Sequence, residues 1–292
     1  MKKTLQNLTI KNSFMFAAVM CEEDNCKEFL EMALGIEIER VEVDKEKTMA
    51  YHPQYKGVRL DIYAKDEHNT RYNVEMQVQP KDSCGKRARY YHSQIDMDML
   101  RTGFEYSELP PAFVIFVCDF DPYGERKYLY IFENRCLQDY SLNMKDASRT
   151  VFLSTAGENP DEVPESMVKF LKFVHADLEE SMQDYNDAYV RKLQKCIQNI
   201  KLSREMEAKY MVLEELMKDE FKAGKAEGKA EGKAEGKAEG KAESILELLE
   251  ELGNIPAELE GRINAEKNLE ILKKWNKLAA KADSIEQFIK NM

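Results

Sequence analysis

An alternation of apolar and polar residues over positions 58–79 constrains the fold of this chain more than any other feature. In both runs, 58–64 and 72–78, every even-numbered residue is apolar or aromatic. Side chains of a β-strand point alternately to its two faces, so the pattern predicts two strands. The odd-numbered positions include Asp61, Glu75 and Gln77, which we therefore expect on one shared face.

The polar segment between the two runs is short, which predicts an antiparallel hairpin. A loop centred on His68 places Asp61 directly opposite Glu75. Carboxylates that face each other at roughly 5 Å repel, so something must offset their charge. The candidates are water, a shared proton, a basic neighbour such as Arg59, or a divalent cation held by oxygen ligands. The alternative is that this face of the hairpin is simply solvated.

Composition limits the class of protein. With 292 residues, 43% of them hydrophobic, the chain can bury one sizeable core and a smaller second unit. The net charge of -11 argues against coating nucleic acid by bulk attraction. The six cysteines form no CxxC pair, which indicates reduced thiols and no zinc site. The start of the chain lacks a signal-peptide core and no stretch is apolar enough for a membrane span, so we expect a cytoplasmic protein without membrane contacts.

The order of elements predicts one mixed α/β domain over residues 1–155. Helical spacing covers 14–34 in two pieces, with Gly35 as the expected stop. A strand near 38–49 precedes the hairpin, and helical spacing returns over 85–103. The apolar run 112–120 predicts a buried central strand, with 127–134 as its expected neighbour and further strand material at 150–154.

The remainder of the chain reads as helix. We expect a helical extension over 156–223, a spacer at 224–243 and a small helical tail module over 244–292. The spacer is five copies of GKAE, whose glycines and stacked like charges make an isolated helix marginal. This favours a solvated, partly helical spacer over a specific coiled coil. The amphipathic C-terminal helices make a homo-oligomer a further expectation.

The helix expected over 85–103 carries a second group of candidate residues. Its start is basic, with Lys86, Arg87 and Arg89 close together. Either this is a patch that faces phosphate groups or it is a solvated helix entrance. Tyr90, Tyr91 and Gln94 are three or four residues apart and can face the hairpin together, although core packing is the alternative for the tyrosines.

The order helix, three strands, helix, strand, with Asp on the second strand and Glu-x-Gln on the third, resembles the PD-(D/E)XK nuclease superfamily. The segments YKGVRLDIYAKD, YNVEMQVQ, RARYYHSQIDMDML and FVIFVCDFDPYG more closely resemble the Rpn family of recombination-promoting nucleases, which are also named as transposases. The resemblance covers roughly residues 5–225. It implies a restriction-endonuclease-like α/β core, with a central mixed sheet flanked by helices, followed by an all-helical C-terminal region.

The resemblance also implies a function. A metal-dependent DNA endonuclease would hydrolyse phosphodiester bonds in recombination or mobile-element processes. Asp61, Glu75 and the backbone carbonyl of Met76 would bind Mg²⁺ or Mn²⁺. Gln77 stands where the superfamily has a lysine, so it offers hydrogen bonds without a positive charge.

Two further sets of residues follow from the same resemblance. Gln94 resembles the helix glutamine of related nucleases, which helps to hold water or substrate. The residues expected to contact DNA are Lys86, Arg87, Arg89, Tyr90 and Tyr91. Because the superfamily lysine is missing, the alternative function is a weak or inactive nuclease fold that serves as a nucleic-acid or protein interaction module.

Overall fold

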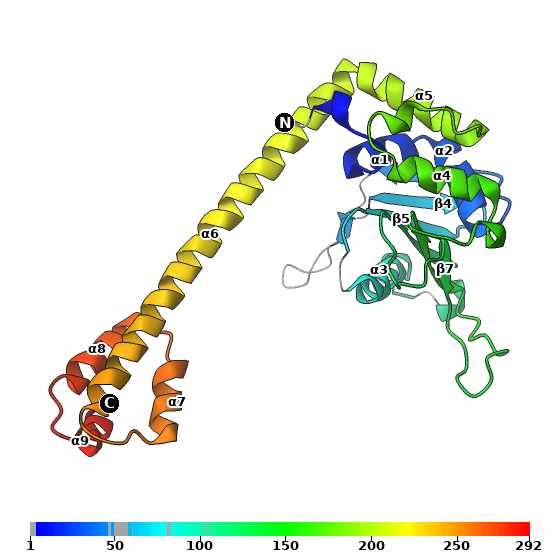
Figure 1. Cartoon of the computed structure of the whole chain (residues 1–292). Coiled ribbons are helices and arrows are strands. Elements are labelled where there is room, and N and C mark those ends of the chain that lie inside the picture. Colours follow the sequence, from blue (N-terminus) through cyan, green and yellow to red (C-terminus); the bar gives the residue numbers. More distant parts are fainter. Residues whose placement is uncertain are drawn as a thin grey trace. The chain divides into compact units, whose positions relative to one another are not determined.

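The computed structural model describes residues 4–45, 48–49, 58–59, 61–80, 83–100, 102–103 and 105–292. The chain divides into two compact units, Met1–Tyr210 and Met211–Met292. The first unit is an α/β domain and the second is helical (Figure 1). This agrees with the fold class expected from the sequence.

A six-stranded sheet forms the centre of the first unit, with the strand order β1-β4-β5-β6-β8-β7. β4 pairs antiparallel with β1 and β5, whereas β6 runs parallel to β5 and β8, so the sheet is mixed. A separate pair is formed by β2 and β3. The strands are β1 (Val41–Lys45), β2 (Thr48–Met49), β3 (Val58–Arg59), β4 (Ile62–Asp66), β5 (Arg71–Gln77), β6 (Ala112–Cys118), β7 (Leu129–Phe132) and β8 (Ser148–Ser154).

The register of the hairpin is the one predicted from the sequence. Ile62 pairs with Val74 and Ala64 with Tyr72, so the loop is centred on His68. The apolar face of the hairpin packs into the larger core, as the alternation predicts. The polar face is not solvated, because Asn73 is 0% and Glu75 2% exposed. The solvated alternative for this face is therefore wrong.

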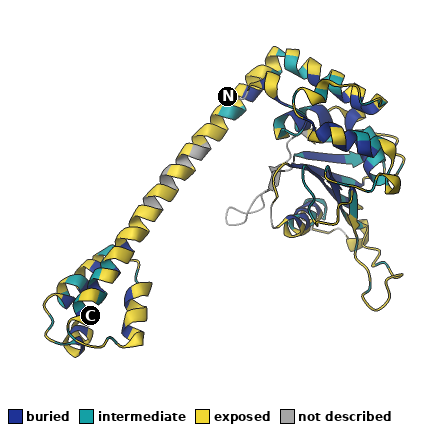
Figure 2. Ribbon diagram, in the orientation of Figure 1, coloured by how far each residue is buried: buried dark blue, intermediate teal, exposed yellow. Residues whose placement is uncertain are grey.

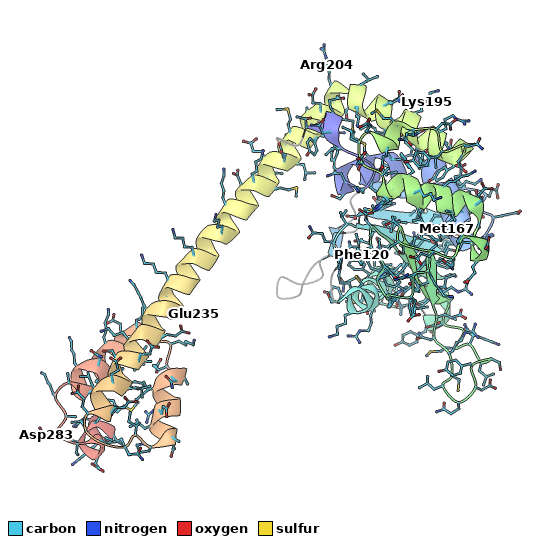
Figure 3. All side chains as sticks on the ribbon, viewed as in Figure 1. Phe120, Met167, Lys195, Arg204, Glu235 and Asp283 are labelled. Carbon is cyan, nitrogen blue, oxygen red and sulfur yellow. The ribbon has the colours of Figure 1, made fainter. Side chains whose placement is uncertain are left out.

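Helices cover both faces of the sheet (Figure 1). One face packs against four helices, α1 (Ser13–Met20), α2 (Glu23–Leu34), α4 (Glu165–His175) and α5 (Ala188–Leu202), and α3 (Cys84–Met99) lies on the other. Figure 2 shows that the buried residues concentrate on the sheet and on the helix faces against it. Two of the residues labelled in Figure 3 illustrate the contrast, because Met167 of α4 is buried and Lys195 of α5 is exposed.

Local signals explain the first two helices. The Asn12 side chain accepts hydrogen bonds from the amides of Phe14 and Met15, which caps the start of α1. Gly35 has a φ of 66°, the left-handed conformation that ends α2. Both the division into two pieces and the glycine stop were predicted from the sequence.

The position of β7 differs from the prediction. The sequence suggested that segment 127–134 lies beside the central strand β6, but β8 lies between them. The physical reason is burial. Ile131 and Phe132 of β7 are 51% and 45% exposed, which suits an edge strand, whereas Val151 and Leu153 of β8 are fully buried.

The repeat region forms part of one long helix, α6 (Arg204–Glu250), where the sequence favoured a partly helical spacer. Extending an existing helix is much easier than nucleating one, and apolar turns at both ends of the repeat supply that start. The alanines of the last two copies, Ala238 and Ala242, are buried in the core of the second unit.

The second unit has its own apolar core. The end of α6 packs against α7 (Ala257–Ala265), α8 (Leu269–Ala279) and α9 (Ile285–Asn291). Trp275 is 5% exposed in this core. Ser284 caps α9 by accepting a hydrogen bond from the amide of Gln287. None of the helices within the described residues is long and apolar enough to cross a membrane.

Candidate active site

Two carboxylates meet on the face of the sheet that α3 covers. Asp61 immediately precedes β4, and Glu75 lies near the end of β5. The Asp61 amide donates to Glu75 Oε1 at 3.3 Å, and the Met76 amide donates to Asp61 Oδ2 at 3.2 Å. These reciprocal bonds from backbone to side chain hold both carboxylates at one end of the hairpin. The apposition predicted from the loop centre is therefore present.

The pair carries more negative charge than its surroundings neutralise. Burial, and then the charge of Asp61, raise the pKa of Glu75 to about 7. The Asp61 amide and the charge of Arg87 act in the opposite direction. Near pH 7 the Glu75 carboxyl is therefore about half protonated.

Gln77 occupies the last position of β5, and its carboxamide is oriented by two bonds. Its Nε2 donates to the Met76 carbonyl at 2.9 Å, and its Oε1 accepts from Arg87 Nη1 at 2.7 Å. The carbonyl expected to bind metal therefore already accepts one hydrogen bond from Gln77.

The residues of α3 do not act as one group. Arg87 and Tyr91 turn toward Glu75, whereas Lys86 and Arg89 are exposed. Gln94 is buried two turns after Arg87, on the same face of the helix. Tyr90 packs partly buried against the core beneath α3. A solvated helix entrance therefore describes Lys86 and Arg89 but not Arg87.

Tyr91 joins Arg87 to the carboxylate pair. Its hydroxyl donates to Glu75 Oε2 at 3.3 Å and accepts from Arg87 Nη2 at 2.7 Å. Burial, followed by the charge of Glu75, raises the pKa of Tyr91, so its hydroxyl stays protonated. Sequence spacing placed Tyr91 and Gln94 on one side of α3, but it did not predict the contact between Arg87 and Gln77.

His92 faces away from this cluster. Its ring nitrogens lie 3.1 Å from Thr150 Oγ1 and 3.2 Å from Ser148 Oγ, on β8. Burial lowers its pKa to about 4, so the ring is neutral at ordinary pH. His92 therefore attaches α3 to the sheet and takes no part in the site.

The site contains two carboxylates, an arginine, a tyrosine and two carboxamides around a strand end. A family model of PD-(D/E)XK nuclease family transposases matches residues 10–227. The chain belongs to this family. A search of curated proteins and a search of solved structures gave no match.

The family match spans the whole sheet and every residue of the cluster. PD-(D/E)XK nucleases in general use divalent metals. Within the described residues, no group of three or more His, Cys, Asp or Glu side chains is placed to hold an ion. Two carboxylates and one carbonyl remain as donors, which suits an ion that keeps several water ligands.

Proposed function

We propose that this member of the PD-(D/E)XK nuclease family transposases is a metal-dependent DNA endonuclease that hydrolyses phosphodiester bonds. The observation that carries the proposal is the buried apposition of Asp61 and Glu75, with the pKa of Glu75 raised to about 7. A fold that needed this region only for stability would gain by replacing one of the two carboxylates. Displaced pKa values of paired acids are typical of functional sites.

The residues present fit a divalent cation. Asp61 and Glu75 would hold it, and the Met76 carbonyl would be a third donor. Hard oxygen donors of this kind prefer Mg²⁺ or Mn²⁺ over softer metals. When bound, the cation would supply Lewis-acid stabilisation to the reacting phosphate.

The other side chains of the cluster have separate roles in this proposal. The Gln77 carboxamide is fixed between Met76 and Arg87 and can orient a polar group of the substrate by hydrogen bonding. Gln94 would help to hold water or substrate from the same face of α3. We assign to Lys86, Arg89 and Tyr90 the contacts to neighbouring DNA phosphates, because the two basic residues are exposed at the start of α3.

The second candidate function is an interaction module without turnover. One observation favours it. Glu75 already accepts bonds from Asp61, Arg87 and Tyr91, and the Met76 carbonyl accepts one from Gln77. These oxygens therefore already have hydrogen-bond donors without an ion. In that case the chain would bind DNA or protein through α3 and would not cleave.

Nicking of supercoiled plasmid in the presence of Mg²⁺ or Mn²⁺ tests the proposal. Either Asp61→Ala or Glu75→Ala should reduce cleavage at least about 100-fold, since each removes a donor to the ion. The double substitution should cost little more than one alone. The matched control is Glu158→Ala, which removes an exposed carboxylate paired with Arg126. Plasmid binding without nicking by the wild-type chain would instead support the interaction module.

A further inference from the structure

Arg87 of α3 places a positive charge at the part of the site where strand β5 carries none. The position two residues after Glu75 carries a carboxamide, so β5 itself brings no cation to the site. α3 brings one from the opposite side, because the Arg87 guanidinium lies against that same carboxamide at 2.7 Å. The guanidinium of Arg87 from the helix and the carboxamide of Gln77 from the strand thus lie in contact at the same end of the site.

Contacts with four residues fix the Arg87 guanidinium. Nη1 donates to Gln77 Oε1 at 2.7 Å, and Nη2 donates to the Tyr91 hydroxyl at 2.7 Å and to Glu75 Oε2 at 3.5 Å. The guanidinium carbon also lies 5.4 Å from the ring centre of Tyr91 and 5.8 Å from that of Phe116. The planar group is therefore held by hydrogen bonds on its edge and by aromatic rings.

The arrangement leaves Arg87 able to reach a ligand. Its side chain is 25% exposed, in contrast to 3% for Glu75. The bond to Glu75 is the longest of its three hydrogen bonds, and at 3.5 Å it is the weakest. Exchange of that bond for a phosphate oxygen would leave the bonds to Gln77 and Tyr91 in place.

We propose that Arg87 supplies from α3 the positive charge that position 77 lacks, and that it donates to the phosphate oxygens of a phosphodiester at the Asp61–Glu75 pair. This inference rests on the proposed nuclease function and deepens it. A guanidinium remains charged at all accessible pH values and offers paired donors that match a phosphate. Gln77 and Tyr91 orient the guanidinium by accepting its hydrogen bonds. Gln77 therefore positions Arg87 in addition to orienting a polar group of the substrate.

The competing explanation is structural, because Arg87 could do no more than neutralise Glu75. The two explanations differ in what a lysine at position 77 should do. In the Arg87→Gln background, Gln77→Lys returns one positive charge to the same location. In the wild-type background the same lysine would lie against Arg87, where like charges repel, so no gain is expected.

Cleavage kinetics of four variants test the inference, with rates normalised to the folded fraction. Arg87→Gln should lower kcat by about 100-fold, as loss of a donor to a developing charge does, and should also raise KM, because one phosphate contact of the bound DNA is lost. Arg87→Lys should retain more activity than Arg87→Gln. Gln77→Lys should restore at least about 10-fold in the Arg87→Gln chain. The matched control is Arg191→Gln, which removes an exposed arginine paired with Asp184 and should leave kcat unchanged.

Binding of a short fluorescein-labelled DNA duplex, followed by anisotropy in EDTA at several salt concentrations, gives a readout that needs no cleavage. Arg87→Gln should reduce the slope of log K against log salt by about one, and Gln77→Lys should return it. Arg87→Met keeps the aliphatic stem over the aromatic rings and replaces Arg87→Gln if that variant does not fold.

Equal kcat for wild type and Arg87→Gln would overturn the inference while leaving the nuclease function intact. So would a loss of activity in Arg87→Gln that the lysine at position 77 does not restore. If the wild-type chain binds the duplex but does not cleave plasmid, the nuclease proposal fails. The salt slope then decides the Arg87–phosphate contact, and an unchanged slope in Arg87→Gln would overturn it.

Discussion

Glu75 is a carboxyl group that the fold holds at an energetic cost. Its pKa rises from 4.5 to about 7 on folding, so the folded chain binds a proton more tightly than the unfolded chain between these values. The contribution of Glu75 to the free energy of unfolding is therefore at its maximum below pH 4.5, and it is lost as the pH rises to 7. The total loss is on the order of 3 kcal/mol, at 1.36 kcal/mol for each pKa unit.

Replacement of this carboxyl by an amide should remove that loss. We expect Glu75→Gln, without added metal, to be more stable than wild type at pH 8 by roughly 1 to 3 kcal/mol. Part of the gain is offset because Arg87 loses its charged partner. Urea unfolding at pH 8 measures the difference. A variant less stable than wild type at that pH would show that the carboxylate is well compensated in the fold.

Residue types and spacing in the sequence were enough to bring Asp61 opposite Glu75. Strand alternation and a loop centre determine a register, and β4 and β5 have that register. The direction of Arg87 was not predictable in the same way. Three basic residues occupy the start of α3, and only the docking of that helix decides which one turns inward.

α3 contacts Glu75 and carries His92, two buried groups whose pKa shifts change the stability of the fold with pH in opposite directions. The pKa of His92 falls from 6.5 to about 4 because burial disfavours its charged form. The unfolded chain then binds the extra proton, so stability from His92 is complete above pH 6.5 and is lost as the pH falls to 4. Glu75 contributes the opposite slope between pH 4.5 and 7, so the two effects oppose each other where the ranges overlap.

Single substitutions should separate the pH dependence of stability that comes from Glu75 from the one that comes from His92. We expect the stability of Glu75→Gln to rise with pH between 4 and 6.5, since the titration of His92 is then no longer opposed by that of Glu75. The stability of His92→Gln should instead fall with rising pH between 4.5 and 7. Urea midpoints across this pH range measure both curves. Parallel curves for the two variants would contradict the assignment.

Elements with strong local signals were predictable from the sequence, and edge positions were not. The cap at Asn12 and the stop at Gly35 lie within a few residues of the helices they delimit. The order of β6, β8 and β7 depends instead on which apolar strand buries both faces. Segment 127–134 is richer in apolar and aromatic residues, five of eight against three of seven in segment 148–154, and yet it takes the edge. Composition therefore does not decide between them, and packing across the whole sheet does.

At the scale of the whole molecule, the two units have separate cores. The core of the first includes Tyr210, and the core of the second begins at Ala238. The intervening part of α6 exposes Met211, Val212, Leu216 and Met217 where its side chains are described. Self-association remains a prediction, and these four residues are a better candidate for it than the buried apolar residues of the tail.

Removal of residues 224–292 should therefore leave the first unit folded. We expect its thermal midpoint to change by less than about 4 °C, since none of its core is lost. Deletion of two GKAE copies should have less effect still. Calorimetry of the truncated chain measures the midpoint, and sedimentation before and after Leu216→Lys tests self-association. An unfolded truncated chain would show that the first unit depends on the tail.

Calorimetric titration of the apoprotein with Mn²⁺ at pH 8 tests the metal site most directly. We predict one binding site in the wild-type chain that is lost in Asp61→Asn, while circular dichroism of the variant is unchanged. The Glu158→Ala chain should bind like wild type, because Glu158 lies on the surface with Arg126. Equal Mn²⁺ binding by wild type and Asp61→Asn would contradict the assignment of Asp61 and Glu75 as the metal site.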